Sequence, residues 1–205
     1  MPYSKSHKRQ TKERILRSAV ELFCHKGFAN VSIDDLMRHA DLTRGAFYAH
    51  FKSKSDVYMQ SITSAAYNSR IINEIPEEVK GKDWLERFLN SYLSSAHIND
   101  EVSPCPMAFM VTDVASNDPN VKKTYTTVFE SFTKLVKQHL PQNDDPDLQA
   151  KLSFAISAMV IGSVAIGRAL DDKNLQKELL RSSQAIATLL SNNNEPKSSV
   201  DVDKG

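Results

Sequence analysis

Apolar residues recur along most of this chain at spacings of three and four, which is the period of an amphipathic helix. A first helix is predicted from about Lys8 to Lys26, and Gly27 ends it. One face of that helix carries four apolar residues: Ile15, Ala19, Leu22 and Phe23. Alternation with a period of two, as in a strand, does not extend over a useful length. The pattern therefore predicts an all-α protein.

Two short helices separated by a tight turn are predicted next. Ser32 and Asp35 have the spacing of a capping box, in which each side chain accepts a hydrogen bond from the other residue's backbone amide. After the turn, Thr43 is a suitable cap for a second helix from about Arg44 to His50. This order of elements is typical of a helix-turn-helix, whose second helix lies in the major groove of DNA.

The pattern of the residues that follow predicts a larger helical body. Proline and polar caps divide it into predicted helices at about 53–75, 83–96, after Pro106, 118–141, 146–170 and 175–191. The last residues contain almost no apolar side chains and are expected to be disordered. The predicted organisation is a three-helix helix-turn-helix domain at 1–54, an effector-binding and dimerisation domain at 55–192, and a tail at 193–205.

The second short helix has two distinct faces. Phe47 and Phe51 fall on one side and are expected to anchor the helix, whereas Arg44 and Tyr48 fall on another and are expected to point outward. Arg can contact guanine edges or phosphate, and Tyr can donate to phosphate. Gly45 costs about 1 kcal/mol of helix stability relative to Ala, which close approach of the backbone to DNA would explain. Spacing alone leaves open a helical hairpin with an ordinary charged surface.

Charge is unevenly distributed along the 205 residues, although the net charge is only +1. Residues 1–56 hold 11 Lys/Arg against 6 Asp/Glu, and the rest hold 15 against 19. A basic head on a mildly acidic body is consistent with phosphate binding at one end, and chance variation in surface charge is the alternative.

The cysteines, the N-terminus and the longest apolar stretch indicate the compartment in which the protein is expected. Cys24 and Cys105 lie far apart and do not form a disulfide framework, which favours a reducing compartment. The N-terminus lacks the apolar run of a signal peptide. The longest apolar stretch, residues 154–169, is expected to be too short to span a bilayer. We expect a soluble, cytoplasmic protein that has no membrane partner.

Residues 11–57 resemble the N-terminal domain of the TetR/AcrR family of bacterial transcriptional regulators. The matching segments are ILRSAVELFCHKGF and VSIDDLMRHADLTRGAFYAHFKSKSDVY. The departures are Asp41, where the family commonly has glycine, and Cys24 in a variable position. The resemblance implies DNA-contacting roles for seven residues: Ser32, Thr43, Arg44, Gly45, Tyr48, His50 and Lys54.

The resemblance also implies a one-component repressor that binds a pseudopalindromic operator on double-stranded DNA as a homodimer and is released by a small-molecule effector. Dimerisation is expected through the helices at about 146–170 and 175–191. The apolar stretch at 154–169 needs burial on two sides, and small residues such as Ala158 and Gly162 permit close helix packing. A central helix in a monomeric core is the alternative.

The effector is expected to be small, hydrophobic, and neutral or weakly polar. Aromatic, methionine and cysteine side chains are the candidates to line its site: Trp84, Phe88, Tyr92, Cys105, Met107, Met110, Phe129 and Phe132. An apolar stripe at helical spacing also suits plain core packing. Cys105 precedes a predicted helix start, where helix dipoles favour a thiolate. It therefore suggests an alternative, a repressor that senses electrophiles or oxidants through this thiol.

Catalysis is not expected. The sequence contains no phosphate-binding glycine loop, nucleophile elbow or His-Glu-x-x-His motif, and it has too few cysteines and no histidine cluster for a zinc site. A helical enzyme that uses Cys105 with His97 or His139 as a base is a remote alternative. An architectural nucleic-acid protein without an effector is another, but it predicts a more basic body.

Overall fold

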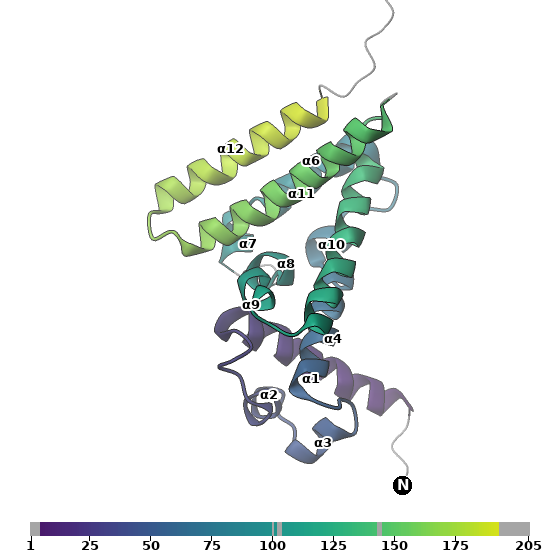
Figure 1. Ribbon diagram of the computed structural model, residues 1–205, viewed down its shortest axis with the longest axis vertical. Coiled ribbons are helices and arrows are strands. Elements are labelled where there is room, and N and C mark those ends of the chain that lie inside the picture. Colours follow the sequence, from purple (N-terminus) through teal and green to yellow (C-terminus); the bar gives the residue numbers. More distant parts are fainter. Residues whose placement is uncertain (1–4, 100, 102–103, 143–144, 193–205) are drawn as a thin grey trace, which may run out of the picture. The chain divides into compact units, whose positions relative to one another are not determined.

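The computed structural model describes residues 5–99, 101, 104–142 and 145–192, and within these ranges the regular elements are all helices (Figure 1). The all-α prediction is therefore confirmed. The chain forms two compact units, Met1–Glu74 with Ser95–Ser131, and Ile75–Ser94 with Phe132–Gly205. The predicted domain limits at residues 54 and 192 stay predictions, and the predicted tail lies outside the described residues.

The first unit contains the N-terminal helices and three short helices from the middle of the chain. Its elements are α1 (Lys5–Lys26), α2 (Ile33–His39), α3 (Arg44–Tyr48), α4 (Lys54–Tyr67), α5 (Arg70–Asn73), α7 (Ser95–Ile98), α8 (Pro106–Phe109) and α9 (Val111–Ala115). Helix α1 packs against α2, α4 and α8. The predicted apolar face of α1 is buried, since Ile15 and Ala19 are fully inaccessible to solvent and Phe23 nearly so. Gly27 ends α1 with a positive φ of 73°, as the sequence predicts.

A single helix at 53–75 was expected, and this prediction is wrong. Helix α4 ends at Tyr67, and the short α5 begins at Arg70. The side-chain amide of Asn68 donates to the carbonyl oxygen of Ser64 at 2.8 Å, and Ser69 has a non-helical ψ of 114°. Asn and Ser side chains compete for backbone hydrogen bonds and so favour helix ends.

The predicted helix at 83–96 is also shorter than expected. Helix α6 (Gly81–Tyr92) ends before Leu93, whose ψ of 53° leaves the helical region, and the separate α7 begins at Ser95. The helix expected after Pro106 is likewise divided, into α8 and α9, at Met110.

The second unit is built around a helical hairpin. Helix α11 (Pro146–Ala169) and α12 (Lys173–Asn192) lie side by side along most of their length, and α6 packs against both (Figure 1). Asp145 caps α11 by accepting the backbone amides of Asp147 and Leu148. Helix α10 (Pro119–His139) begins in the first unit and ends in the second.

Helix α11 corrects the expectation about membrane length. It begins eight residues before the apolar stretch at 154–169, and among the described residues it is the one helix long and apolar enough to cross a bilayer. Length and composition alone do not separate such a helix from the core helix of a soluble protein. In this structure α11 is packed against α12 and α6.

Candidate nucleic-acid interface

The turn between α2 and α3 is fixed by several polar contacts. The capping box at the start of α2 is confirmed: the Asp35 amide donates to Ser32 Oγ at 3.0 Å, and the Ser32 amide donates to Asp35 Oδ2 at 3.0 Å. These bonds from Ser32 lower the pKa of the Asp35 carboxyl group. At the other end of α2, the Arg14 guanidinium donates to the carbonyl oxygen of Ala40 at 2.7 Å. Asp41 then takes a positive φ of 52°, which explains why glycine suits this position in similar sequences.

Helix α3 is held by its aromatic face. It spans five residues, shorter than the predicted 44–50, and a helix of this length has no stability of its own in water. Phe47 and Phe51 are almost completely buried, and their ring centroids lie 5.5 Å apart. The predicted inward orientation of both phenylalanines is confirmed. Packing therefore determines where the outward side of α3 points.

Arg44 and Tyr48 lie on the exposed side, as the helical spacing predicts. Tyr48 is 58% exposed, so its ring and hydroxyl are open to solvent. Arg44 Nη1 donates to Asp34 Oδ2 at 2.7 Å, which links α3 to α2. The Tyr48 hydroxyl and, after it, the Asp34 carboxylate raise the pKa of Arg44. The guanidinium is thus charged, accessible and pre-positioned by an acidic neighbour.

Three small residues complete this surface. Ser32, Thr43 and Gly45 are all exposed. Thr43 occupies the N-cap position of α3, but its side chain makes no capping hydrogen bond, so this part of the prediction is wrong. Apart from its chain neighbours and the backbone of its own helix, a Cβ atom added to Gly45 would meet no atom within 4 Å, so packing against other elements does not require the glycine.

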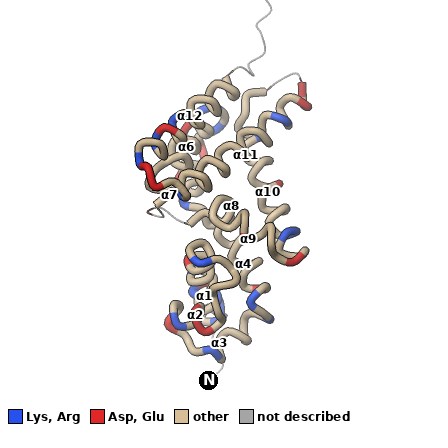
Figure 2. The backbone as a smooth tube through the Cα atoms, turned by 60° about the vertical axis from the view of Figure 1, so that its left-hand side comes forward, with Lys and Arg blue, Asp and Glu red and all other residues tan. Residues whose placement is uncertain are grey.

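Two lysines that the sequence analysis did not single out lie near the same surface. His50 is half-buried; desolvation lowers its pKa, and the charges of Lys8 and Lys12 lower it further. Lys12 Nζ also lies 5.7 Å from the ring centroid of Phe51. Figure 2 marks the Lys and Arg positions of α1 and α3 in blue. The basic composition of residues 1–56 was the signal for such residues, but the sequence alone did not bring α1 beside the end of α3.

Lys54 is placed differently from the other candidates. Its ammonium group donates to the carbonyl oxygen of Phe28 at 2.8 Å and lies 4.1 Å from the Phe28 ring centroid. This contact uses one of its three donors and ties the start of α4 to the segment after α1.

The predicted effector-lining residues fall into both units. In the second unit, aromatic rings pack on one another: Trp84 stacks on Phe88 at 5.2 Å, and Phe132 lies 5.7 Å from Phe88 and 6.0 Å from Tyr92. His139 stacks on Trp84 at 4.0 Å and accepts the Gly81 amide; desolvation by burial lowers its pKa.

The remaining candidates, Cys105, Met107, Met110 and Phe129, belong to the first unit. Met107 and Met110 are buried there. Cys105 is half-buried at the N-cap of α8. Desolvation by burial raises the pKa of Tyr125, with a smaller contribution from the neighbouring Cys105. Cys24 is buried in α1. Both cysteines are thiols rather than parts of a disulfide.

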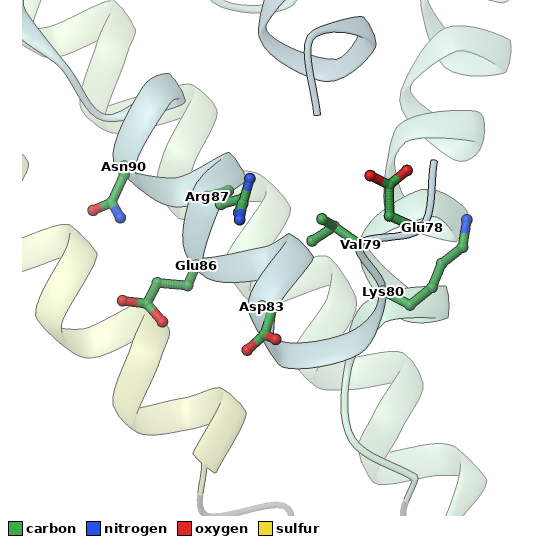
Figure 3. A pocket seen from close by; sticks show the side chains of 7 residues that line it. All are labelled: Glu78, Val79, Lys80, Asp83, Glu86, Arg87 and Asn90. Atoms are coloured by element: carbon green, nitrogen blue, oxygen red, sulfur yellow. The ribbon is translucent and has the colours of Figure 1, made fainter. Parts of the chain in front are cut away.

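A cavity of about 630 Å³ lies elsewhere, along α6 and the segment before it (Figure 3). Its lining is mainly polar and charged, and consists of Glu78, Val79, Lys80, Asp83, Glu86, Arg87 and Asn90. None of the predicted effector residues is among them. Within the described ranges, no group of three or more His, Cys, Asp or Glu side chains is placed to hold a metal ion.

Comparison with known proteins relates this arrangement to a family. Residues 15–59 match the family described as bacterial regulatory proteins, tetR family. An uncharacterised HTH-type transcriptional regulator of Lactococcus lactis is 24% identical over 182 residues, which cover 82% of this chain and 88% of that protein. IcaR of Staphylococcus aureus, described as a negative transcriptional regulator of a biofilm operon, is 33% identical over 51 residues, covering 25% of this chain and 27% of IcaR.

Solved structures agree in fold. The reduced form of Escherichia coli NemR has a TM-score of 0.72 at 17% identity, and the match covers 93% of this chain and 100% of that one. The local match spans the helix-turn-helix just described, and the structural match extends over the helical body as well. Residues 15–59 of this chain therefore carry the helix-turn-helix domain of the TetR family of transcriptional regulators, and the chain as a whole shares its fold with solved regulators.

Proposed function

We propose that this protein is a repressor that binds a pseudopalindromic operator as a homodimer and is released by a small hydrophobic effector. The observation that carries the DNA-binding part is the exposed side of α3, where Arg44 and Tyr48 project while Phe47 is fully buried. We propose that Arg44 reads a base edge or phosphate, and that Tyr48, Ser32, Thr43 and His50 contact phosphates. Lys54 is proposed to contribute a phosphate contact through a donor that Phe28 does not use.

The homodimer is proposed to form through α11 and α12. On helix α12, positions at spacings of four and three carry Leu175, Leu179, Ser182, Ile186 and Leu189, so the stripe is apolar except at the serine. Leu175, Ile186 and Leu189 are 49%, 47% and 52% exposed. On α11, Phe154 and Ile166 are more than half exposed, and the exposed positions between them include Ala155 and Ala158. A stripe with this period is typical of a helix that packs against another helix, and a second copy with the same stripe gives a two-fold interface.

Repression and effector release are proposed on separate grounds. IcaR is named a negative regulator, which favours repression in this chain as well. The effector is proposed to be hydrophobic because its candidate lining residues are aromatic and methionine side chains. Its location within the helical body stays a prediction, as does a cytoplasmic location for the protein. The thiol-sensor alternative also stays a prediction, supported by the half-buried position of Cys105 at the start of α8.

Replacing Arg44 with alanine tests the proposed function. We expect the affinity for operator DNA to fall about 10-fold or more, because a bidentate contact of Arg with guanine contributes about 1–3 kcal/mol. The measurement is fluorescence anisotropy with the DNA upstream of the protein's own gene against a scrambled duplex, at fixed physiological salt. Loss of the preference for the specific duplex, with unchanged helical circular dichroism, is the expected result.

Arg70 provides a matched control. Its side chain is 60% exposed and pairs with Glu74 at 2.9 Å, just as that of Arg44 is 60% exposed and pairs with Asp34 at 2.7 Å. Arg70→Ala should leave operator affinity unchanged. Equal losses in the two variants, or none in Arg44→Ala, would contradict a role for α3 in recognition. Weak, salt-sensitive binding of both duplexes by the wild-type protein would favour the architectural alternative.

Gly45→Ala should change stability and binding in opposite directions. The added methyl group meets no other element of the protein and removes the helix cost of glycine, so we expect a gain of up to about 1 kcal/mol in the free energy of unfolding. Operator affinity should nevertheless fall, because the methyl group would lie between the backbone of α3 and DNA. Chemical denaturation and the anisotropy assay measure the two effects. Unchanged affinity would mean that the α3 backbone does not approach DNA closely at this position.

A further inference from the structure

Asp113 lies outside the helix-turn-helix sequence but contacts it directly. The residue is in α9, and its Oδ2 atom accepts two hydrogen bonds within the first unit. The Tyr58 hydroxyl on α4 donates to this oxygen at 2.5 Å, and the backbone amide of Phe28, just after α1, donates to it at 2.9 Å. One carboxylate oxygen thus joins α9 to both α4 and the segment between α1 and α2.

Both backbone polar groups of Phe28 make hydrogen bonds to side chains. Its amide is bound by Asp113, and its carbonyl oxygen is bound by the Lys54 ammonium at 2.8 Å. Its ring also packs against those of Phe23 and Tyr58, with centroids 6.0 and 5.0 Å apart. Helix α1 ends immediately before it in a turn at Gly27, where φ is 73°. The position of this turn therefore depends on groups from α4 and α9.

The hydrogen bond between Tyr58 and the Asp113 carboxylate is expected to be strong. Tyr58 is fully buried, and desolvation, followed by the hydrogen bond to Asp113, raises its pKa, so it remains a donor. Hydrogen bonds to a charged acceptor are about twice as strong as neutral ones. Helix α8, which directly precedes α9, packs against α1 and α4. A shift of the α8–α9 segment would thus move Asp113 relative to α1 and α4, the helices that precede and follow α2 and α3 in the chain.

We propose that Asp113 is a positioning residue for DNA binding, which holds the Gly27–Phe28 turn and α4 in the arrangement that presents α3 to the operator. It acts through Phe28 and Tyr58 and does not itself contact DNA. This inference rests on the proposed function. The chemistry consists of hydrogen bonds from a hydroxyl and a backbone amide to one carboxylate. The hydroxyl of Tyr58 and the carboxylate of Asp113 can each be removed by a single substitution.

Two conservative variants test the proposal. Asp113→Asn removes the charge at nearly constant shape, and Tyr58→Phe removes one donor while it keeps the ring. We expect operator affinity to fall about 10-fold in Asp113→Asn, and by a smaller factor in Tyr58→Phe. The double variant should lose less than the product of the two single losses, because the groups share one hydrogen bond. The dependence of affinity on salt should keep its slope, since no phosphate contact is removed.

Tyr125→Phe is the matched control for a purely structural effect. The Tyr125 hydroxyl donates to the carbonyl oxygen of Met107 at 2.7 Å within the same unit, and desolvation raises its pKa as it does that of Tyr58. This variant should lower the melting temperature about as much as Tyr58→Phe and leave operator affinity unchanged. Equal affinity losses in Tyr125→Phe and Tyr58→Phe would overturn the proposal.

A second readout needs no DNA. Amide hydrogen exchange of peptides covering residues 27–31 should become about 10-fold faster in Asp113→Asn, because the acceptor of the Phe28 amide is weakened. Unchanged exchange would show that Asp113 does not hold the turn. Wild-type affinity that is retained in Asp113→Asn would show that it holds the turn without positioning α3. A wild-type protein that does not distinguish the operator from a scrambled duplex would refute the proposed function, and the positioning role with it.

Discussion

Replacing Phe47 with alanine is expected to lower the free energy of unfolding by about 3–5 kcal/mol, the usual loss when a buried aromatic side chain is truncated. The Phe47 ring is fully buried and lies 5.5 Å from that of Phe51. Helix α3 has only five residues, so it depends on this contact for its position and for its helical state. Chemical denaturation, followed by circular dichroism, measures the loss.

Tyr48→Ala is the control for this prediction. Tyr48 is the next residue along the chain and is also aromatic, but it is 58% exposed. Its removal should change the free energy of unfolding by no more than about 0.5 kcal/mol, as is usual for surface positions, while operator affinity falls. Phe47→Ala should weaken both properties. If Tyr48→Ala proved the more destabilising of the two, the assignment of the buried and exposed faces of α3 would be wrong.

The helix-turn-helix was predictable because its signals are local. The capping box of Ser32, the stop at Gly27 and the four-residue spacing of Phe47 and Phe51 each depend on residues close in sequence. The structure adds the reason for the one unusual residue, Asp41, whose positive φ is the conformation that glycine adopts most readily. Where a helix is specified by its own caps and its own apolar face, the sequence is sufficient to place it.

Contacts between distant segments were not predictable in the same way. Asp113 appeared in the sequence as one acidic residue of the helical body, and nothing near it indicated a bond to the Phe28 amide 85 positions earlier. Lys54 was expected only at a phosphate, yet its ammonium binds the Phe28 carbonyl. Helix breaks at residues 68–69 and 93–94 were missed because helical periodicity continues across them. Such features depend on tertiary packing, which overrides local preference.

The pair of substitutions Ile186→Glu and Leu189→Glu is expected to convert the protein to a monomer and to lower operator affinity about 100-fold or more. Both side chains are about half exposed on α12, in the stripe proposed to face a second copy. Two carboxylates from each copy would then lose hydration at an apolar interface, which is unfavourable. A monomer presents one recognition helix instead of two, and it loses the gain in affinity that comes from simultaneous binding of two half-sites.

Sedimentation equilibrium and the anisotropy assay measure the two consequences separately. Tyr67→Glu is the control, because Tyr67 is 76% exposed at the end of α4 and lies outside the α11–α12 hairpin. Like each of the two test substitutions, it introduces one carboxylate in place of an exposed large side chain, and it should leave both the mass and the operator affinity unchanged. Since Ile186 and Leu189 are exposed within one chain, the double variant should keep its helical circular dichroism. A double variant that stays dimeric would show that the subunits meet through another surface.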